Sequence, residues 1–213
     1  MAKIPDFIPV HWLRIQTFCE YQLYLTEVKC IADQESDAIR QGRNTHTGLE
    51  AVHNAMATET VTLSDAIDKA LATSTPFVMR EAHVKGNRLT GLVDQIEFYL
   101  DKVYIVDDKP RSPNSDPYLS DKRQVMAYCL AFLSQYPGLR LPVFAVIHDR
   151  DTGDTLWRQQ FTMEDREDIA DTINRIIGIL DGTRQPVPSK NWRKCMHCRF
   201  SSHCIKSLAR GVT

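Results

Sequence analysis

Residues 81–111, EAHVKGNRLTGLVDQIEFYLDKVYIVDDKPR, decide the fold of this chain. Runs of β-branched and aromatic residues alternate here with turn residues, a pattern typical of β-hairpins. The stretch predicts a meander of three strands, at about residues 81–85, 89–98 and 103–106. A turn at Gly86-Asn87 joins the first two strands.

Polar side chains close the third strand of this meander. Asp107 and Lys109 are two residues apart, so on a strand both side chains leave by the same face. Asp94, on the neighbouring strand, can share that face. Two carboxylates and an ammonium suit a hard divalent cation and a negatively charged substrate. Taken alone, however, Asp107 and Lys109 are more typical of a strand that passes from the core into solvent.

The composition is that of a globular domain. Of 213 residues, 43% are hydrophobic and 25% are charged. The first residues lack the basic and apolar regions of a signal peptide, and no apolar run approaches the roughly 18 residues of a membrane span. We therefore expect a soluble, cytoplasmic chain. The net charge of −1 does not by itself favour a nucleic-acid partner.

The charge is nevertheless uneven along the chain. Residues 182–213 contain seven Lys or Arg and no Asp or Glu. With Trp192 and Phe200 interleaved, this tail could follow a phosphate backbone and stack on bases. A solvated basic terminus explains the same composition equally well.

The six cysteines predict a metal centre rather than disulfides, which are rare in the cytoplasm. Cys195, Cys198 and Cys204 form a C-x2-C-x5-C set, which is a metal-site pattern with one ligand missing. An expected helix at residues 7–31 carries Cys19 and ends at Cys30, and either thiol could complete the set. Each could also be a small buried residue. Thiolate sets of this kind take zinc or an iron–sulfur cluster.

The remaining segments predict a mixed α/β domain. Helices are expected at residues 34–58, with Gly42 and His46, from Ser64 onward, and at 118–135, where Gln124 and Tyr128 share a face. Strands are expected at 141–150, buried on both faces, and at 155–161. A capping box at Thr162–Asp165 opens a last long helix.

The order of these motifs resembles a known family. Asp94, Asp107-x-Lys109 and Gln124-x3-Tyr128 resemble the RecB-like branch of the PD-(D/E)XK nucleases. With the cysteine set added, the chain is similar to the CRISPR-associated RecB-like exonucleases (the fourth Cas family), which carry an iron–sulfur cluster. Iron–sulfur nuclease domains of bacterial recombination helicase–nucleases share the layout. The resemblance covers the chain from about Phe18 to Cys204.

The resemblance implies a restriction-endonuclease-like α/β fold with a mixed sheet flanked by helices. It implies one domain, residues 1–213, made of a helical part (1–75), a catalytic core (76–182) and a cluster-binding tail (183–213). The cluster region would join the N-terminal helix to the tail through four ligands: Cys19, Cys195, Cys198 and Cys204. A [4Fe–4S] cluster is expected, with [2Fe–2S] as the alternative. Cys30 and Cys129 are then left as core residues.

The resemblance also assigns the catalytic roles. It gives metal binding, of Mn²⁺ or Mg²⁺, to four residues: His46, Asp94, Asp107 and Asp108, the last through its backbone carbonyl. Lys109 matches the catalytic lysine, and Gln124 and Tyr128 match a motif that supports the site and contacts DNA. Glu81 matches a frequent upstream acid. Asp107 stands where the family most often has Glu, and its shorter reach could shift the metal.

The function that the resemblance implies is a metal-dependent DNA exonuclease that prefers single-stranded ends and can also act as an endonuclease. It further implies a role in CRISPR spacer acquisition, beside the integrase proteins. Three other interpretations stay open: a catalytically weak DNA-binding adaptor of an integration complex, a nuclease domain of a recombination-repair system, and a structural module with a zinc-ribbon tail.

Overall fold

The computed structural model of the chain describes residues 2–31, 65–66, 68–69, 72, 75–110 and 116–209. The helix expected at residues 34–58, and with it His46, lies outside the described residues. The expected helix after Ser64 is described at a few positions only, among them the buried Ala66.

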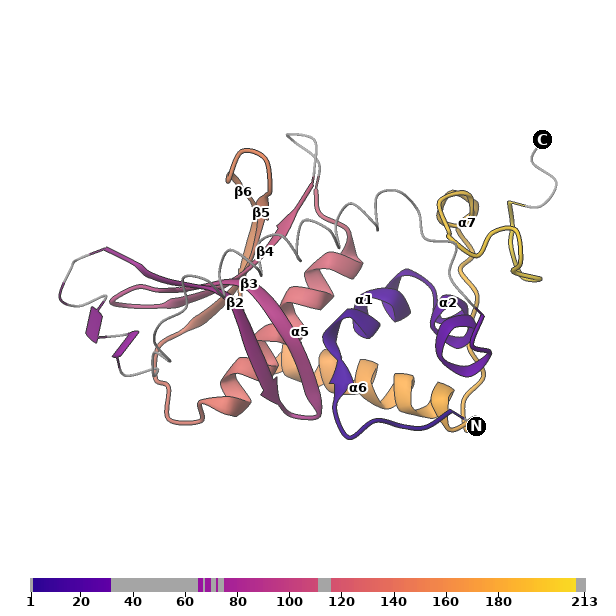
Figure 1. Cartoon of the computed structure of the whole chain (residues 1–213), viewed down its shortest axis with the longest axis horizontal. Coiled ribbons are helices and arrows are strands. Elements are labelled where there is room, and N and C mark those ends of the chain that lie inside the picture. The colour runs from indigo at the N-terminus through magenta and orange to yellow at the C-terminus, as the bar shows by residue number, and fades with distance from the viewer. Residues whose placement is uncertain are drawn as a thin grey trace.

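A mixed six-stranded sheet forms the centre of the fold (Figure 1). Its strands are β1 (Ile8–Pro9), β2 (Phe77–Gly86), β3 (Leu89–Phe98), β4 (Val103–Lys109), β5 (Val143–Asp149) and β6 (Thr155–Gln160). The order across the sheet is β1-β3-β4-β5-β6, and β2 pairs with β3. The pairs β2–β3, β3–β4 and β5–β6 are antiparallel, whereas β4–β5 and β1–β3 are parallel.

The predicted meander is confirmed, with longer outer strands than expected. β2 begins at Phe77 rather than near residue 81, and β4 continues to Lys109. The strand begins early because Phe77 and Met79 are partly buried against the core, while Val78 and Arg80, which alternate with them, are exposed. The predicted buried strand is also confirmed, because the inward residues of β5 and Val146 on its other face are almost fully buried.

Three longer helices pack on one another, and the first two of them also pack against the sheet. They are α1 (Val10–Phe18), α5 (Leu119–Gln135) and α6 (Met163–Leu180). α5 is the crossover between the parallel strands β4 and β5, as a parallel pair requires. It packs against the sheet, for example through the rings of Phe98 and Phe132, 6.3 Å apart. α6 begins with the predicted capping box, in which Thr162 and Asp165 bond reciprocally.

The N-terminal helix is shorter than predicted. One helix was expected over residues 7–31, but α1 ends at Phe18 because Cys19 has an extended backbone. Two short segments follow, α2 (Glu20–Leu23) and a π-helical turn (Tyr24–Val28). A last short helix, α7 (Trp192–Met196), lies in the tail.

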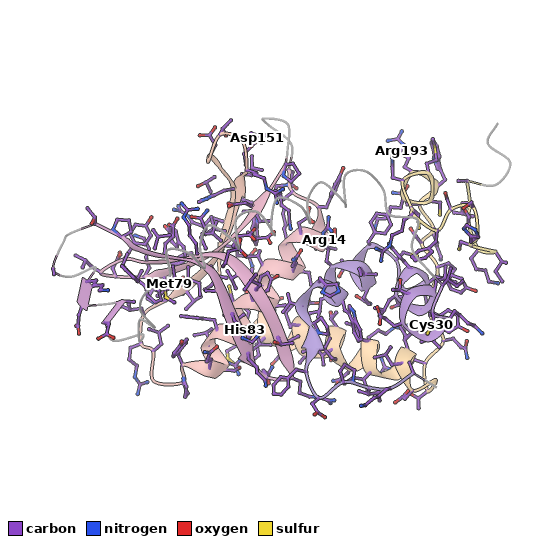
Figure 2. All side chains as sticks on the ribbon, viewed as in Figure 1. Arg14, Cys30, Met79, His83, Asp151 and Arg193 are labelled. Carbon is purple, nitrogen blue, oxygen red and sulfur yellow. The ribbon has the colours of Figure 1, made fainter. Side chains whose placement is uncertain are left out.

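Two burial predictions need correction. Cys30 was expected in the core but is exposed just after the π-helical turn (Figure 2), where its φ of 50° ends the helical path. Phe200 was one of two aromatic residues of the tail that could stack on bases, but it is only 1% exposed and is therefore not available for stacking. The burial predicted for Cys129 is confirmed.

No helix among the described residues has the length and apolar character needed to cross a membrane.

Candidate active site

A fork in the sheet creates the site. β2 pairs with β3 along its length, from Leu89 to Phe98, and so occupies one edge of that strand. On the opposite edge, β4 pairs only with residues 95–98, and β1 pairs only with residues 89–90. β4 and β1 therefore share one edge of β3 and leave a gap between them. Asp94 lies in this gap.

The side-chain alternation shifts by one residue at the same place. In β2 the inward side chains are Met79 and then Ala82, and in β3 they are Val93 and then Ile96. Glu81 lies at the shift in β2 with a φ of 49°, a left-handed conformation that a residue with a Cβ rarely adopts. Irregularities of this kind in strands and strained backbones gather at functional sites.

The register places three acidic residues across three neighbouring strands. Arg80 pairs with Gln95 and Ala82 with Val93, so Glu81 lies opposite Asp94. Gln95 also pairs with Val106, which puts Asp107 at the next position beside Asp94. There the regular ladder ends, and the backbone N–H of Asp108 donates to Oδ2 of Asp94 at 2.7 Å.

Lys109 joins these acids to α5. Its Nζ lies 2.7 Å from Oδ2 of Asp107, a residue that is only 3% exposed. The same Nζ donates to Oε1 of Gln124 at 3.3 Å, and Nε2 of Gln124 donates to the Tyr128 hydroxyl at 3.3 Å. The structure therefore brings together five of the predicted site residues in one network: Asp94, Asp107, Lys109, Gln124 and Tyr128.

A glycine makes room for this network. A Cβ at Gly91 would lie 2.7 Å from Cε1 of Tyr128 and 3.3 Å from Cβ of Val10. Such contacts are closer than van der Waals distance, so β3 can approach the Tyr128 ring only without a side chain at residue 91.

The charges in the site do not balance. Burial raises the pKa of Asp94 to about 7, the charge of Asp107 adds to the rise, and the Asp108 N–H and Lys109 oppose it. Burial also raises the pKa of Tyr128, again with a contribution from Asp107, so its hydroxyl stays protonated. The raised pKa of Asp94 means that its ionised form lacks full compensation, and a bound cation would provide it.

Asp108 faces away from this network. Its Oδ2 accepts from Nε2 of Gln95 at 2.9 Å, and its Oδ1 lies 4.0 Å from Nδ1 of His148. Its backbone carbonyl, the atom predicted to bind metal, accepts from Nη2 of Arg150 at 3.1 Å. Among the described residues, no three His, Cys, Asp or Glu side chains are arranged so that they could hold a metal ion. His46, the further ligand that was predicted, lies outside them.

The four cysteines of the predicted cluster meet at a second place. Cys19, at the end of α1, lines one pocket together with Cys195, Cys198 and Cys204 of the tail. The backbone N–H of Ser189 donates to Sγ of Cys19 at 3.3 Å. Burial raises the pKa of Cys198, and the three other thiols add to the rise. The thiols are thus neighbours, although within the described residues they do not form a closed ligand set.

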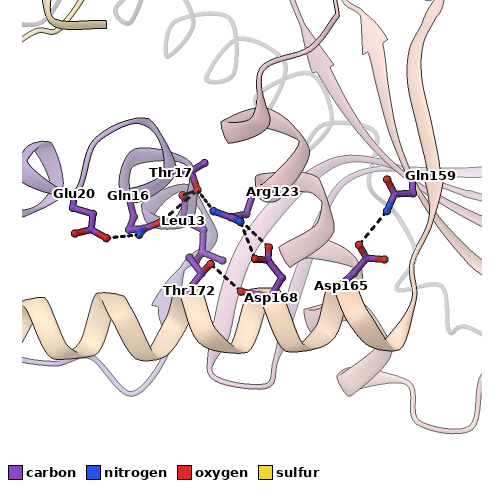
Figure 3. Close-up of polar contacts among 9 residues, drawn as sticks. All are labelled: Leu13, Gln16, Thr17, Glu20, Arg123, Gln159, Asp165, Asp168 and Thr172. Atoms are coloured by element: carbon purple, nitrogen blue, oxygen red, sulfur yellow. Dashed lines mark hydrogen bonds and ion pairs between the residues drawn. The ribbon is translucent and has the colours of Figure 1, made fainter. Parts of the chain in front are cut away.

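Several contacts between the helices near the candidate active site and the thiol pocket were not predicted from the sequence. Arg123 of α5 reaches Thr17 of α1 at 3.3 Å and binds both carboxylate oxygens of Asp168 on α6 (Figure 3). Glu20, directly after Cys19, accepts two hydrogen bonds from Arg175, at 2.7 and 2.6 Å. The two ion pairs join residues 45 and 155 positions apart and leave no local pattern, so no sequence signal identifies them.

Two solved structures are similar to this chain. A crystal structure of the protein SSO0001 has a TM-score of 0.49 and 17% identity, over 98% of this chain and 90% of that one. A crystal structure named "Putative exonuclease", from Eubacterium rectale, has a TM-score of 0.50 and 15% identity, over 90% of this chain and 88% of that one. At 15% identity, the similarity to the Eubacterium rectale structure concerns the fold alone.

No curated protein matches the chain. The family model of the PD-(D/E)XK nuclease superfamily matches residues 65–205, a stretch that contains strands β2 to β6, Asp94, Asp107-x-Lys109 and the pair Gln124 and Tyr128. The chain therefore belongs to the PD-(D/E)XK nuclease superfamily.

Proposed function

We propose that this protein is a metal-dependent deoxyribonuclease whose site is formed by Asp94, Asp107 and Lys109. The proposal rests on a pair of carboxylates whose negative charge is not fully compensated. Asp94 and Asp107 are neighbours on β3 and β4, and the single positive charge of Lys109 acts on both. A site built this way favours a cation and a phosphate together, which is what phosphodiester hydrolysis needs.

The residues have distinct roles in this proposal. Asp94 and Asp107 would hold a Mg²⁺ or Mn²⁺ ion, with His46 and the Asp108 carbonyl as further proposed ligands, and the ion would supply Lewis acidity to the scissile phosphate. Lys109 presents an ammonium to the charge that develops on the phosphate. Gln124 fixes the position of that ammonium. Tyr128 keeps its proton and orients Gln124.

Membership of a nuclease superfamily supports DNA as the substrate. We further propose exonuclease action on single-stranded ends, with endonuclease action as a further activity. The proposed physiological setting is CRISPR spacer acquisition beside the integrase proteins, and DNA recombination-repair is the alternative. These finer points rest on the resemblance of the motifs to RecB-like exonucleases.

We also propose that an iron–sulfur cluster, of the [4Fe–4S] type, is bound by Cys19, Cys195, Cys198 and Cys204. Two features of the thiol pocket fit such a group: four thiols converge there, and a backbone N–H donates to one sulfur. The cluster would clamp the end of α1 to the tail. This would close a loop of about 175 residues between Cys19 and Cys195 and so strongly restrict the unfolded chain.

The nuclease proposal is tested with anaerobically purified protein and end-labelled single-stranded DNA, in Mn²⁺, Mg²⁺ or EDTA. We expect shortening of the DNA only with metal, and its loss in Asp94→Ala and Lys109→Ala. Lys102→Ala, in the turn before β4, is the matched control and should cleave normally. Wild-type protein that binds the DNA but leaves it whole with every metal would support the adaptor function instead.

The cluster proposal has its own readout. We expect visible absorption and bound iron and sulfide in wild-type protein, and their loss in Cys198→Ser. Cys30→Ser, which changes an exposed thiol outside the pocket, should keep both. Stoichiometric zinc without iron would show that the tail is a zinc site.

A further inference from the structure

Arg14 of α1 lies where this helix meets the N-terminal end of α5 (Figure 2). Its Nε donates to Oδ1 of Asp121 at 2.8 Å. The Asp121 side chain is fully buried, whereas the Arg14 side chain is 50% exposed. A buried carboxylate therefore fixes one edge of a guanidinium whose remainder reaches the surface.

The contact with Asp121 places Arg14 beside the candidate active site. Asp121 lies in the first turn of α5, three residues before Gln124, and side chains at this spacing are neighbours about 5–6 Å apart at Cβ. Gln124 in turn accepts from Lys109. Two neighbouring buried side chains of one helix, Asp121 and Gln124, thus lie between Arg14 and Lys109.

Other cations near this end of α5 are already engaged. Lys109 pairs with Asp107, and Arg123 binds Asp168 through two nitrogens. Across the described parts of the chain, the Nη groups of Arg14 have no hydrogen-bond partner, since its only bond there runs through Nε. These are the donors that a planar guanidinium presents to a phosphate.

We propose that Arg14 binds a backbone phosphate next to the scissile one and so positions the DNA strand over Asp94, Asp107 and Lys109. This inference rests on the proposed nuclease function, because it assigns a phosphate-binding residue to that same site. Asp121 acts by holding the guanidinium in place, so that little side-chain freedom is lost when the strand binds.

The experiment measures binding without cleavage. A labelled oligothymidine is titrated in EDTA over a series of salt concentrations, with wild type, Arg14→Gln, Arg14→Lys and Arg158→Gln. Gln at residue 14 can still donate to Asp121, so the buried carboxylate keeps a hydrogen bond from α1. Arg158 is the matched control, since it binds the Tyr104 hydroxyl on the face of the sheet away from the site.

We expect Arg14→Gln to weaken binding roughly tenfold, the scale of one charge-assisted hydrogen bond. The slope of log K against log salt should fall by about 0.7, the value for one phosphate contact on a single strand. Arg14→Lys should restore the slope because it keeps the charge, and Arg158→Gln should match wild type. In cleavage assays, Arg14→Gln should raise KM far more than it lowers kcat.

An unchanged salt slope in Arg14→Gln, with a folded protein, overturns the inference and leaves Arg14 as a partner of Asp121 only. That result is independent of the nuclease proposal. A reduced slope together with no cleavage by wild type in any metal would support the role of Arg14 and sink the nuclease proposal.

Discussion

At Asp94, burial and the neighbouring carboxylate of Asp107 raise the pKa from the ordinary 3.8 to about 7. The folded protein therefore binds a proton that the unfolded chain has released. Between about pH 4 and about pH 7 this difference makes stability fall as pH rises, since protonation favours the folded state. We expect the melting temperature of the metal-free protein to decline over this range, as measured by thermal denaturation.

Two variants test the assignment to Asp94. Asp94→Asn should remove this decline, whereas Asp101→Asn, at a carboxylate whose side chain is 73% exposed, should leave it in place. Lys109→Ala should move the decline to higher pH because the lysine charge lowers the pKa of Asp94. Added Mn²⁺ should raise the melting temperature more at about pH 8 than at about pH 6, where protons compete. A decline that persists unchanged in Asp94→Asn would contradict the assignment.

Residue-scale predictions succeeded where spacing alone determines geometry. Asp107 and Lys109 are two apart on a strand, so the sequence predicted that they share a face, and in the structure their side chains are in contact. The four-residue spacing of Gln124 and Tyr128 likewise predicted that they share one face of a helix, and in the structure Gln124 donates to the Tyr128 hydroxyl. The catalytic and metal-binding roles of these residues stay predictions. The burial of Cys129 was predicted correctly, but that of Cys30 was not, because Cys30 is exposed owing to a local turn in the backbone.

At the scale of elements, Gly91 allows β3 and α5 to approach closely. Gly91→Ala would put a methyl group 2.7 Å from the Tyr128 ring. Overpacking of this kind costs about 1–3 kcal/mol, and the melting temperature should fall by about 2–4 °C per kcal/mol. Displacement of Tyr128 should also lower kcat. Gly138→Ala is the control, since nothing lies within 4 Å of a Cβ there. Equal melting temperatures for the two variants would count against the close approach.

The elements themselves were largely predictable, and their irregularities were not. Apolar residues identified β3 as a run bounded by turns, β5 as a near-continuous run buried on both faces, and α5 and α6 by their helical spacing. The shift at Glu81 blurred the alternation of β2 and hid where that strand begins. β1 is two residues long, too short for any periodicity, although it sets one side of the fork. The break at Cys19 also lacks a sequence signal, since the apolar pattern continues past it.

At the scale of the whole molecule, Glu20 holds the tail to the N-terminal helices. It accepts from Arg175 and from the backbone N–H of Val187 at 2.8 Å. Burial of Glu20 favours a higher pKa, but these hydrogen bonds outweigh it and lower the pKa. We expect Glu20→Ala to release the tail, so that limited trypsin digestion cuts faster after Lys190 and Arg193. Glu167→Ala, at an exposed position of α6, should be cut like wild type. Peptide mass analysis identifies the cleaved bonds.

α1 spans from the forked sheet to the thiol pocket, and its nine residues, about 13 Å in length, carry Val10 at one end and lead to Cys19 at the other. Any coupling along this helix between the proposed DNA substrate and the proposed iron–sulfur cluster obeys thermodynamic reciprocity. If loss of the cluster weakened the binding of DNA by some factor, DNA would strengthen retention of the cluster by the same factor. A DNA strand bound in the candidate active site would then protect the cluster from chelators without touching it.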